Sequence, residues 1–260
     1  MKKGIGMLLF VLQSLVMTVL PVQAAEVHLS VAASMTEAIR ELDAAFTAEQ
    51  PGVTMLPNFG SSGALAKQLL QGAAADIFIS ANPKWLSYLE KEGKITKQTV
   101  RDLAVNTLVV VGRPGVVVNS LADLAAMTRV AIGSPGSVPA GQYAEQAMRA
   151  AGVYERLAAD KKLVMAQDVR QALLYAERGE VDAAFVYRTD ALLAEKAVIL
   201  YAVPAGLHDP ITYPVGLTVA GEKNGAARAF YDFLASPAAV SILEKYGFDT
   251  PAAAAAAPGR

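Results

Sequence analysis

The sequence contains no cysteine among its 260 residues. The chain therefore forms no disulfide, holds no thiolate-bound metal and uses no cysteine nucleophile. An export signal at its amino terminus cannot be of the lipoprotein type, because that type requires a cysteine. The absence of this one residue excludes a whole class of catalytic and metal-binding sites.

Neither sign of charge is in excess, and histidine is scarce. Lysine and arginine number 23, aspartate and glutamate 24, and histidine two, for a net charge of −1. A chain of this kind has no broad attraction to nucleic acid or to anionic membranes, so any anion must be held locally. His28 lies in an expected strand and His208 in an expected loop, so they are not expected to share a zinc ion. With 53% apolar and 18% charged residues, the chain is globular rather than disordered.

Long apolar runs are missing, except at the amino terminus. There, Lys2 and Lys3 precede a largely apolar run over residues 4–20, which meets Pro21 and then the small-residue sequence VQA. This pattern predicts a cleaved export signal over residues 1–24. The alternative, a membrane anchor, is disfavoured because the run is shorter than the roughly 20 apolar residues of a membrane span. Removal of the signal would change the formal charge from −1 to −3.

In the rest of the chain, apolar runs alternate with segments of helical periodicity. Strands are expected over residues 27–32, 53–59, 75–80, 107–111, 129–133, 162–166, 181–187, 198–203 and 213–219. Helices are expected over residues 35–50, 64–71, 83–93, 120–127, 142–151, 168–178, 226–234 and 237–246. This alternation predicts an α/β fold with mostly parallel sheets covered by helices on both faces.

Two such series, followed by a return segment, predict two α/β domains. We place the first domain at residues 25–105 plus 214–250, and the second at residues 106–213. The last stretch, residues 251–260 (PAAAAAAPGR), has low complexity and is expected to be disordered.

Four turns between a strand and a helix have unusual chemistry. They are an S-x-x-E capping box at Ser34, a GSSG turn that includes Ser62, a Pro/Gly-rich loop at residues 134–141, and a D-x-x-Q capping box at Asp168. Helix starts present unpaired N–H groups and the positive end of a dipole. Several of them around one cleft could hold a dianion without lysine or arginine. Taken singly, each turn could equally be an ordinary cap or a packing device.

Three side chains near these turns allow two interpretations. Tyr187 ends an apolar strand, so its hydroxyl could point into a cleft or its ring could close the core. Arg170 and Arg188 could bind an anion, but we favour their pairing with Asp168 and Asp190.

Patterns for enzyme activity are weak. No G-x-S-x-G elbow is present, and GSSG does not match the phosphate-binding loop of nucleotide hydrolases. Ser62 and His208 could form a hydrolase pair, but His208 lies in a Gly/Asp/Pro loop where a solvated role is favoured.

The chain resembles the periplasmic molybdate-binding proteins of ABC uptake systems. The resemblance is carried by segments that run in order over nearly the whole chain after the signal. They are AASMTEA, NFGSSGALAKQ, ADIFISANPKW, NTLVVV, VPAGQYA, DVRQAL, FVYRTD and FYDFLASPAA.

This resemblance implies a fold and a set of ligand-binding residues. The fold is the two-domain (type II) fold of periplasmic binding proteins, with an oxyanion held between the domains by neutral donors. Ser34 and Ser62 are then expected to contribute backbone N–H and hydroxyl groups, Ala140 and Val169 backbone N–H groups, and Tyr187 its phenol.

The chain departs from the family in one turn. Where the family has an A-S-S-S type of sequence, this chain has Gly60-Ser61-Ser62-Gly63, and the choice of Ser62 over Ser61 follows from alignment through Leu65. Gly63 removes one possible hydroxyl, which we expect to alter the fine tuning of the site rather than its existence.

The resemblance predicts a monomeric periplasmic carrier. It would capture molybdate or tungstate by hinge closure and deliver it to an ABC permease in the membrane, without enzymatic activity, nucleic acid, cofactor or direct metal-ion ligand. A donor-only site suits an oxyanion that carries no proton. The alternatives are a carrier of sulfate or another tetrahedral oxyanion, a secreted serine hydrolase that uses Ser34 or Ser62, and an adhesion or structural role.

Overall fold

The computed structural model of the protein describes residues 25–251. The expected export signal at residues 1–24 and almost all of the expected tail at residues 251–260 lie outside this part of the chain. Within residues 25–251, no helix is long and apolar enough to cross a membrane.

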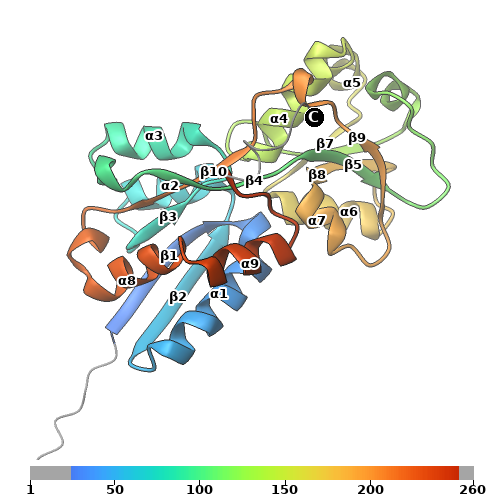
Figure 1. Cartoon of the computed structure of the whole chain (residues 1–260). Coiled ribbons are helices and arrows are strands. Elements are labelled where there is room, and N and C mark those ends of the chain that lie inside the picture. Colours follow the sequence, from blue (N-terminus) through green and yellow to red (C-terminus); the bar gives the residue numbers. More distant parts are fainter. Residues whose placement is uncertain (1–24, 252–260) are drawn as a thin grey trace, which may run out of the picture.

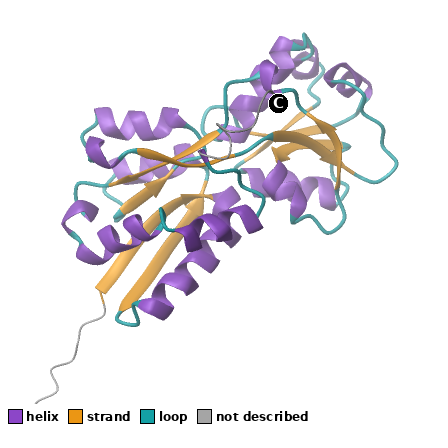
Figure 2. Cartoon of the chain, viewed as in Figure 1, coloured by secondary structure: helices purple, strands orange, loops and turns teal. Residues whose placement is uncertain are grey.

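The strands form two separate sheets, each flanked by helices (Figures 1 and 2). The first sheet has the order β2-β1-β3-β10-β4. Strand β1 pairs in parallel with β2 and β3, whereas β10 is antiparallel to both β3 and β4. Its strands are β1 (Ala25–Ala32), β2 (Val53–Gly60), β3 (Ile77–Ile79), β4 (Arg101–Val105) and β10 (Thr212–Leu217).

The second sheet repeats this arrangement with the order β7-β6-β8-β5-β9. Strand β6 is parallel to β7 and β8, and β5 is antiparallel to β8 and β9. Its strands are β5 (Leu108–Gly112), β6 (Val130–Gly133), β7 (Leu163–Ala166), β8 (Ala183–Tyr187) and β9 (Val198–Ala202).

Each sheet and its helices form one lobe. The first lobe carries α1 (Thr36–Glu49), α2 (Ser62–Leu70), α3 (Pro83–Lys91), α8 (Gly225–Phe233) and α9 (Pro237–Lys245). The second lobe carries α4 (Pro139–Ala150), α5 (Tyr154–Ala159), α6 (Val169–Glu177) and α7 (Arg188–Leu192). Five short 3₁₀ helices complete the described elements, namely η1 (Ala33–Met35), η2 (Lys97–Thr99), η3 (Leu121–Ala126), η4 (Ala205–Leu207) and η5 (Gly221–Lys223).

The expected α/β fold is confirmed, with one reversed strand in each sheet. Each reversed strand follows a stretch where the chain passes between the lobes. Strand β5 follows residues 106–107, and strand β10 follows residues 203–211. The other strands end at the junction of the lobes, so a strand that begins there must run the opposite way. The sheets are therefore mixed, and the division into domains at residues 25–105 plus 214–250 and 106–213 stays a prediction, because the second dividing point falls inside β10.

Strand β4, the helices α5 and α7 and the 3₁₀ helices η1, η2, η4 and η5 were not expected from the sequence, and η3 was misassigned. Strand β4 and the short helices α5 and α7 carry little periodicity of their own. Residues 121–126 form a 3₁₀ helix rather than the expected α-helix. Reciprocal hydrogen bonds between Ser120 and Asp123 cap the start of this helix.

The core consists of one large apolar cluster that extends through both lobes and a smaller one between α2, α3 and the first sheet. The β-strands contribute fully buried aliphatic side chains, and the helices cover them with one apolar face each, as in Ala38, Ile39 and Leu42 of α1. Both sheets are thereby held rigidly, so that the turns at the ends of their strands keep fixed positions.

Candidate functional site

All five residues expected to bind a ligand line one small cavity between the lobes. We call this cavity the donor pocket. In this closed arrangement its volume is about 10 Å³, about the space of one water molecule, so the lobes must part for a larger ligand to enter. None of its lining residues carries a charge. They are Ala32, Ala33, Ser34, Ser62, Ala81, Val138, Pro139, Ala140, Val169 and Tyr187.

Ser34 enters the donor pocket from the turn after β1. It lies in η1, and α1 begins only at Thr36 with no side-chain cap. The expected S-x-x-E capping box is therefore wrong, because the 3₁₀ turn moves the start of the helix past Ser34. The Ser34 hydroxyl instead lies 2.9 Å from the hydroxyl of Tyr213 on β10.

Ser62 is the first residue of α2, after β2. Its hydroxyl oxygen accepts a hydrogen bond of 2.9 Å from the backbone N–H of Ala81. The neighbouring Ser61 is the residue before the helix, and its hydroxyl is buried without a hydrogen-bond partner among residues 25–251. Only Ser62 of the two lines the donor pocket.

Ala140 and Val169 bring backbone groups from two helix starts of the second lobe. Ala140 is the second residue of α4, which begins at Pro139, so the helix starts earlier than the expected residue 142. Val169 is the first residue of α6, and the preceding Asp168 accepts the N–H of Gln171 as expected for a helix cap. N–H groups in a first helical turn have no partner inside the helix, so both are free to donate.

Tyr187 is the last residue of β8 and is almost fully buried. Its hydroxyl has no hydrogen-bond partner among the described residues. Burial, together with nearby Tyr213, raises the pKa of Tyr187 well above its ordinary value, so its phenol stays protonated. Of the two interpretations that the sequence left open, the structure favours a hydroxyl that faces the pocket.

Charged side chains lie behind the donor pocket rather than in it. Arg170 pairs with Asp190 at 3.0 Å and with Glu37, so its expected pairing with Asp168 is wrong. The pairing follows from the fold, because α6 points Arg170 toward α7 and across to α1. Burial raises the pKa of Asp190 to about 7, although the Arg170 guanidinium and the Tyr187 N–H act to lower it.

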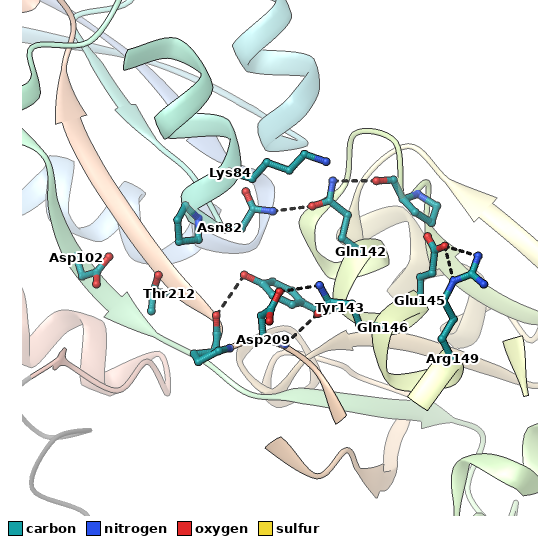
Figure 3. Close-up of a pocket in the computed structure, with 13 residues that line it drawn as sticks. Asn82, Lys84, Asp102, Gln142, Tyr143, Glu145, Gln146, Arg149, Asp209 and Thr212 are labelled. Atoms are coloured by element: carbon teal, nitrogen blue, oxygen red, sulfur yellow. Dashed lines mark hydrogen bonds and ion pairs between the residues drawn. The ribbon is translucent and has the colours of Figure 1, made fainter. Parts of the chain in front are cut away.

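Direct contacts join the two lobes on either side of the pocket. The Gly63 N–H donates to the Ser137 carbonyl oxygen at 2.9 Å, next to Ser62. The Asn82 side chain donates to the Gln142 side chain at 2.8 Å (Figure 3). With the Arg170–Glu37 ion pair, these contacts hold the lobes closed around the donor pocket.

A larger cavity of about 760 Å³ lies beside these contacts (Figure 3). Its lining includes the carboxylates of Asp102, Glu145 and Asp209 as well as Lys84 and Arg149. The carboxylates would repel a dianion, so this cavity is a poorer candidate for an oxyanion than the smaller donor pocket.

The alternative sites suggested by the sequence are not assembled. His208 contacts the Asp209 carbonyl oxygen and the ring of Tyr143, and it does not line the pocket that contains Ser62. His28 lies near Glu26 on β1. Among residues 25–251 there is no group of three or more histidines and carboxylates that could hold a metal ion.

Several residues around the pocket could not be found from the sequence. Tyr213 and Ala81 contact the pocket-lining serines only through long-range pairings, and Asn106 contacts Tyr213 in the same way. No local motif marks these residues, and their positions follow from the reversed β10 and from the chain crossing before β5.

Known proteins resemble the chain over most of its length. The family model for bacterial extracellular solute-binding proteins matches residues 27–249. A putative ABC transporter substrate-binding lipoprotein of Bacillus subtilis is 39% identical, with 85% of each chain covered. A molybdate-binding protein of Haemophilus influenzae is 36% identical, with 86% of this chain and 90% of the relative covered. Among solved structures, the periplasmic molybdate-binding protein of Azotobacter vinelandii has a TM-score of 0.78 at 25% identity, covering 86% of this chain and 99% of that chain.

Proposed function

The chain belongs to the family of bacterial extracellular solute-binding proteins, and from this premise we propose that it captures molybdate or tungstate for an ABC transporter. The ligand-binding groups are the hydroxyls of Ser34 and Ser62, the phenol of Tyr187, and the backbone N–H groups of Ala140 and Val169. The molybdate-binding relatives support this assignment.

One observation carries the proposal: hydrogen-bond donors from both lobes surround a pocket that has no charged lining residue. The starts of α4 and α6 add the positive ends of helix dipoles, each worth about 0.3–1 kcal/mol to a nearby anion. A dianion is stabilised there without a cation, and it bridges the lobes.

Two properties separate molybdate and tungstate from other oxyanions. Phosphate is partly protonated near neutral pH and needs an acceptor, which a donor-only pocket lacks. Sulfate is unprotonated but smaller, so fixed donors would be left partly unpaired, at about 1–3 kcal/mol for each buried group. The sulfate-carrier alternative is therefore disfavoured.

The protein acts outside the cytoplasmic membrane as a monomeric carrier. Residues 1–24 serve as a cleaved export signal, and the loaded protein delivers its ligand to a membrane permease. The ligand is cargo rather than a cofactor, and no chemical step is performed on it, because neither serine has a histidine base.

Calorimetric titration with molybdate, tungstate, sulfate and phosphate tests the proposal. We expect tight binding of the first two and much weaker binding of the others. Sulfate binding as tight as that of molybdate would contradict the assignment, and turnover of a chromogenic ester would revive the hydrolase alternative.

Two variants test the site. Ser34→Ala and Tyr187→Phe should each weaken molybdate binding by roughly 10- to 150-fold, because each removes one hydrogen bond to a charged group, worth about 1.5–3 kcal/mol. Ser30→Ala is a matched control, since Ser30 is a buried serine like Ser34 but lies in β1 and does not line the pocket. Unchanged affinity in both variants would remove these residues from the site.

A further inference from the structure

Behind Ser34 lies a chain of buried hydrogen bonds whose direction can be worked out. Asn106, Thr189 and Tyr213 are all buried, and the Tyr213 hydroxyl lies 2.9 Å from the Ser34 hydroxyl. Distance alone leaves open which of the two hydroxyls donates. The rest of the chain decides it.

The orientation of the Asn106 amide is set by a backbone group. The Thr107 N–H, which can only donate, lies 2.9 Å from the Asn106 Oδ1 atom. The other side-chain atom is therefore the amide nitrogen with its two protons. One proton goes to the Thr189 hydroxyl at 2.9 Å, and the other to the Tyr213 hydroxyl at 3.2 Å.

Tyr213 thus receives a proton from Asn106 and has one of its own to give. Among the described residues, the partners of its hydroxyl are Asn106 and Ser34. If Ser34 also donated to Tyr213, the phenol proton would be buried without an acceptor, which is unfavourable. Tyr213 therefore donates to Ser34, and the Ser34 proton is left for the donor pocket.

Ser62 shows the same arrangement by a different route. Its hydroxyl oxygen accepts the Ala81 N–H, a group that can only donate. Both serines therefore accept from the protein and keep their protons for the pocket. Two unrelated contacts with the same outcome indicate that hydroxyl direction is a built-in property of this site.

We propose that Tyr213, held by Asn106, is a positioning residue that directs the Ser34 hydroxyl to donate to the bound oxyanion. The inference rests on the proposed function and adds a specificity determinant to it. With Ser34 held as a donor, an oxygen atom of an unprotonated dianion accepts a hydrogen bond from its hydroxyl. An OH group of a protonated oxyanion would face the Ser34 proton and find no acceptor there.

The test is Tyr213→Phe, which keeps the ring and its edge contacts with Tyr187 and Phe248. Molybdate affinity should fall by roughly 3- to 10-fold, and the ratio of molybdate to phosphate affinity should narrow. In a Ser34→Ala background, Tyr213→Phe should have no further effect on affinity. Tyr231→Phe is the matched control, because its hydroxyl donates to the Thr99 carbonyl oxygen on the side of the first lobe away from the pocket.

The outcomes separate the two proposals. If the wild-type protein binds none of the oxyanions, the proposed function fails. Two results with a molybdate-binding wild type would overturn only the role of Tyr213. In the first, Tyr213→Phe leaves the molybdate affinity and the ratio of molybdate to phosphate affinity unchanged. In the second, Tyr213→Phe loses as much affinity in the Ser34→Ala background as it does when Ser34 is present. Should Tyr213→Phe fold poorly, Asn106→Ala tests the same chain, with the same loss expected and the same dependence on Ser34.

Discussion

Gly63 lies where the two lobes touch, and a side chain there should keep them apart. Its N–H donates to the Ser137 carbonyl oxygen of the second lobe. A Cβ atom at Gly63 would lie 2.6 Å from that oxygen and 2.7 Å from the Ser137 Cα atom, closer than real Cβ contacts. Gly63→Ala should therefore disfavour the closed arrangement, in which backbone meets backbone.

The size of the effect follows from the cost of overpacking, about 1–3 kcal/mol. If this cost falls on the closed, ligand-bound form, molybdate affinity drops by roughly 5- to 150-fold. The same Cβ would also meet the ring edge of the buried Trp85 at 2.6 Å, but this contact lies within the first lobe, so its cost falls on the open and closed forms alike and does not change the affinity. Alanine also suits the first turn of α2 better than glycine, so the free protein should stay folded.

Calorimetry measures the affinity, and small-angle X-ray scattering of the loaded protein measures closure. Gly136→Ala is a matched control next to Ser137, because a Cβ atom there would meet nothing within 4 Å. A Gly63→Ala protein with wild-type affinity and wild-type scattering would refute the reasoning.

Two further predictions concern the charges behind the pocket. Glu37→Gln removes the ion pair with Arg170 across the lobes but leaves the Arg170–Asp190 contact in place, and it should weaken molybdate binding about fivefold. Glu155→Gln, which breaks an exposed pair with Arg149 within the second lobe, should not change the titrations. The second prediction concerns Asp190, whose carboxyl group keeps its proton up to about pH 7 in the folded protein but loses it near pH 3.8 in the unfolded chain. The wild type should therefore lose stability between these two pH values. Relative to Asp190→Asn, its free energy of unfolding should fall by roughly 1–4 kcal/mol. Urea unfolding of both proteins between pH 4 and 8 measures the two free energies of unfolding. If the wild type instead gained stability over Asp190→Asn as pH rises, Asp190 would be a carboxylate held ionised by Arg170, and the prediction would be wrong.

The sequence predicted most of the elements, because apolar periodicity is a local signal. The runs that became β1, β5, β6 and β8 are buried strands, and Asn82 and Asp168 cap the helices that follow them. Strand β4 was not expected, since it carries little periodicity and its one neighbour in the sheet, β10, lies far away in the sequence.

Local motifs were less reliable for the partners of individual side chains. The S-x-x-E pattern at Ser34 satisfies the rule for a capping box, yet a 3₁₀ turn intervenes and Tyr213 takes the hydroxyl. Arg170 was expected to pair with Asp168, which is near in sequence, and it pairs with Asp190 and Glu37 instead. Both differences arise because contacts between elements far apart in the sequence outweigh contacts between neighbours along the chain.

The reversed strands and the placement of charge explain together how a neutral pocket can be selective. Because β10 begins at the junction of the lobes, it brings Tyr213 directly behind Ser34, and the crossing before β5 brings Asn106 behind Tyr213. Arg170 follows Val169 on α6, where a free guanidinium would attract any anion. Its pairing with Asp190 and Glu37 withdraws it from the pocket, so that recognition depends on directed donors at fixed positions rather than on net charge.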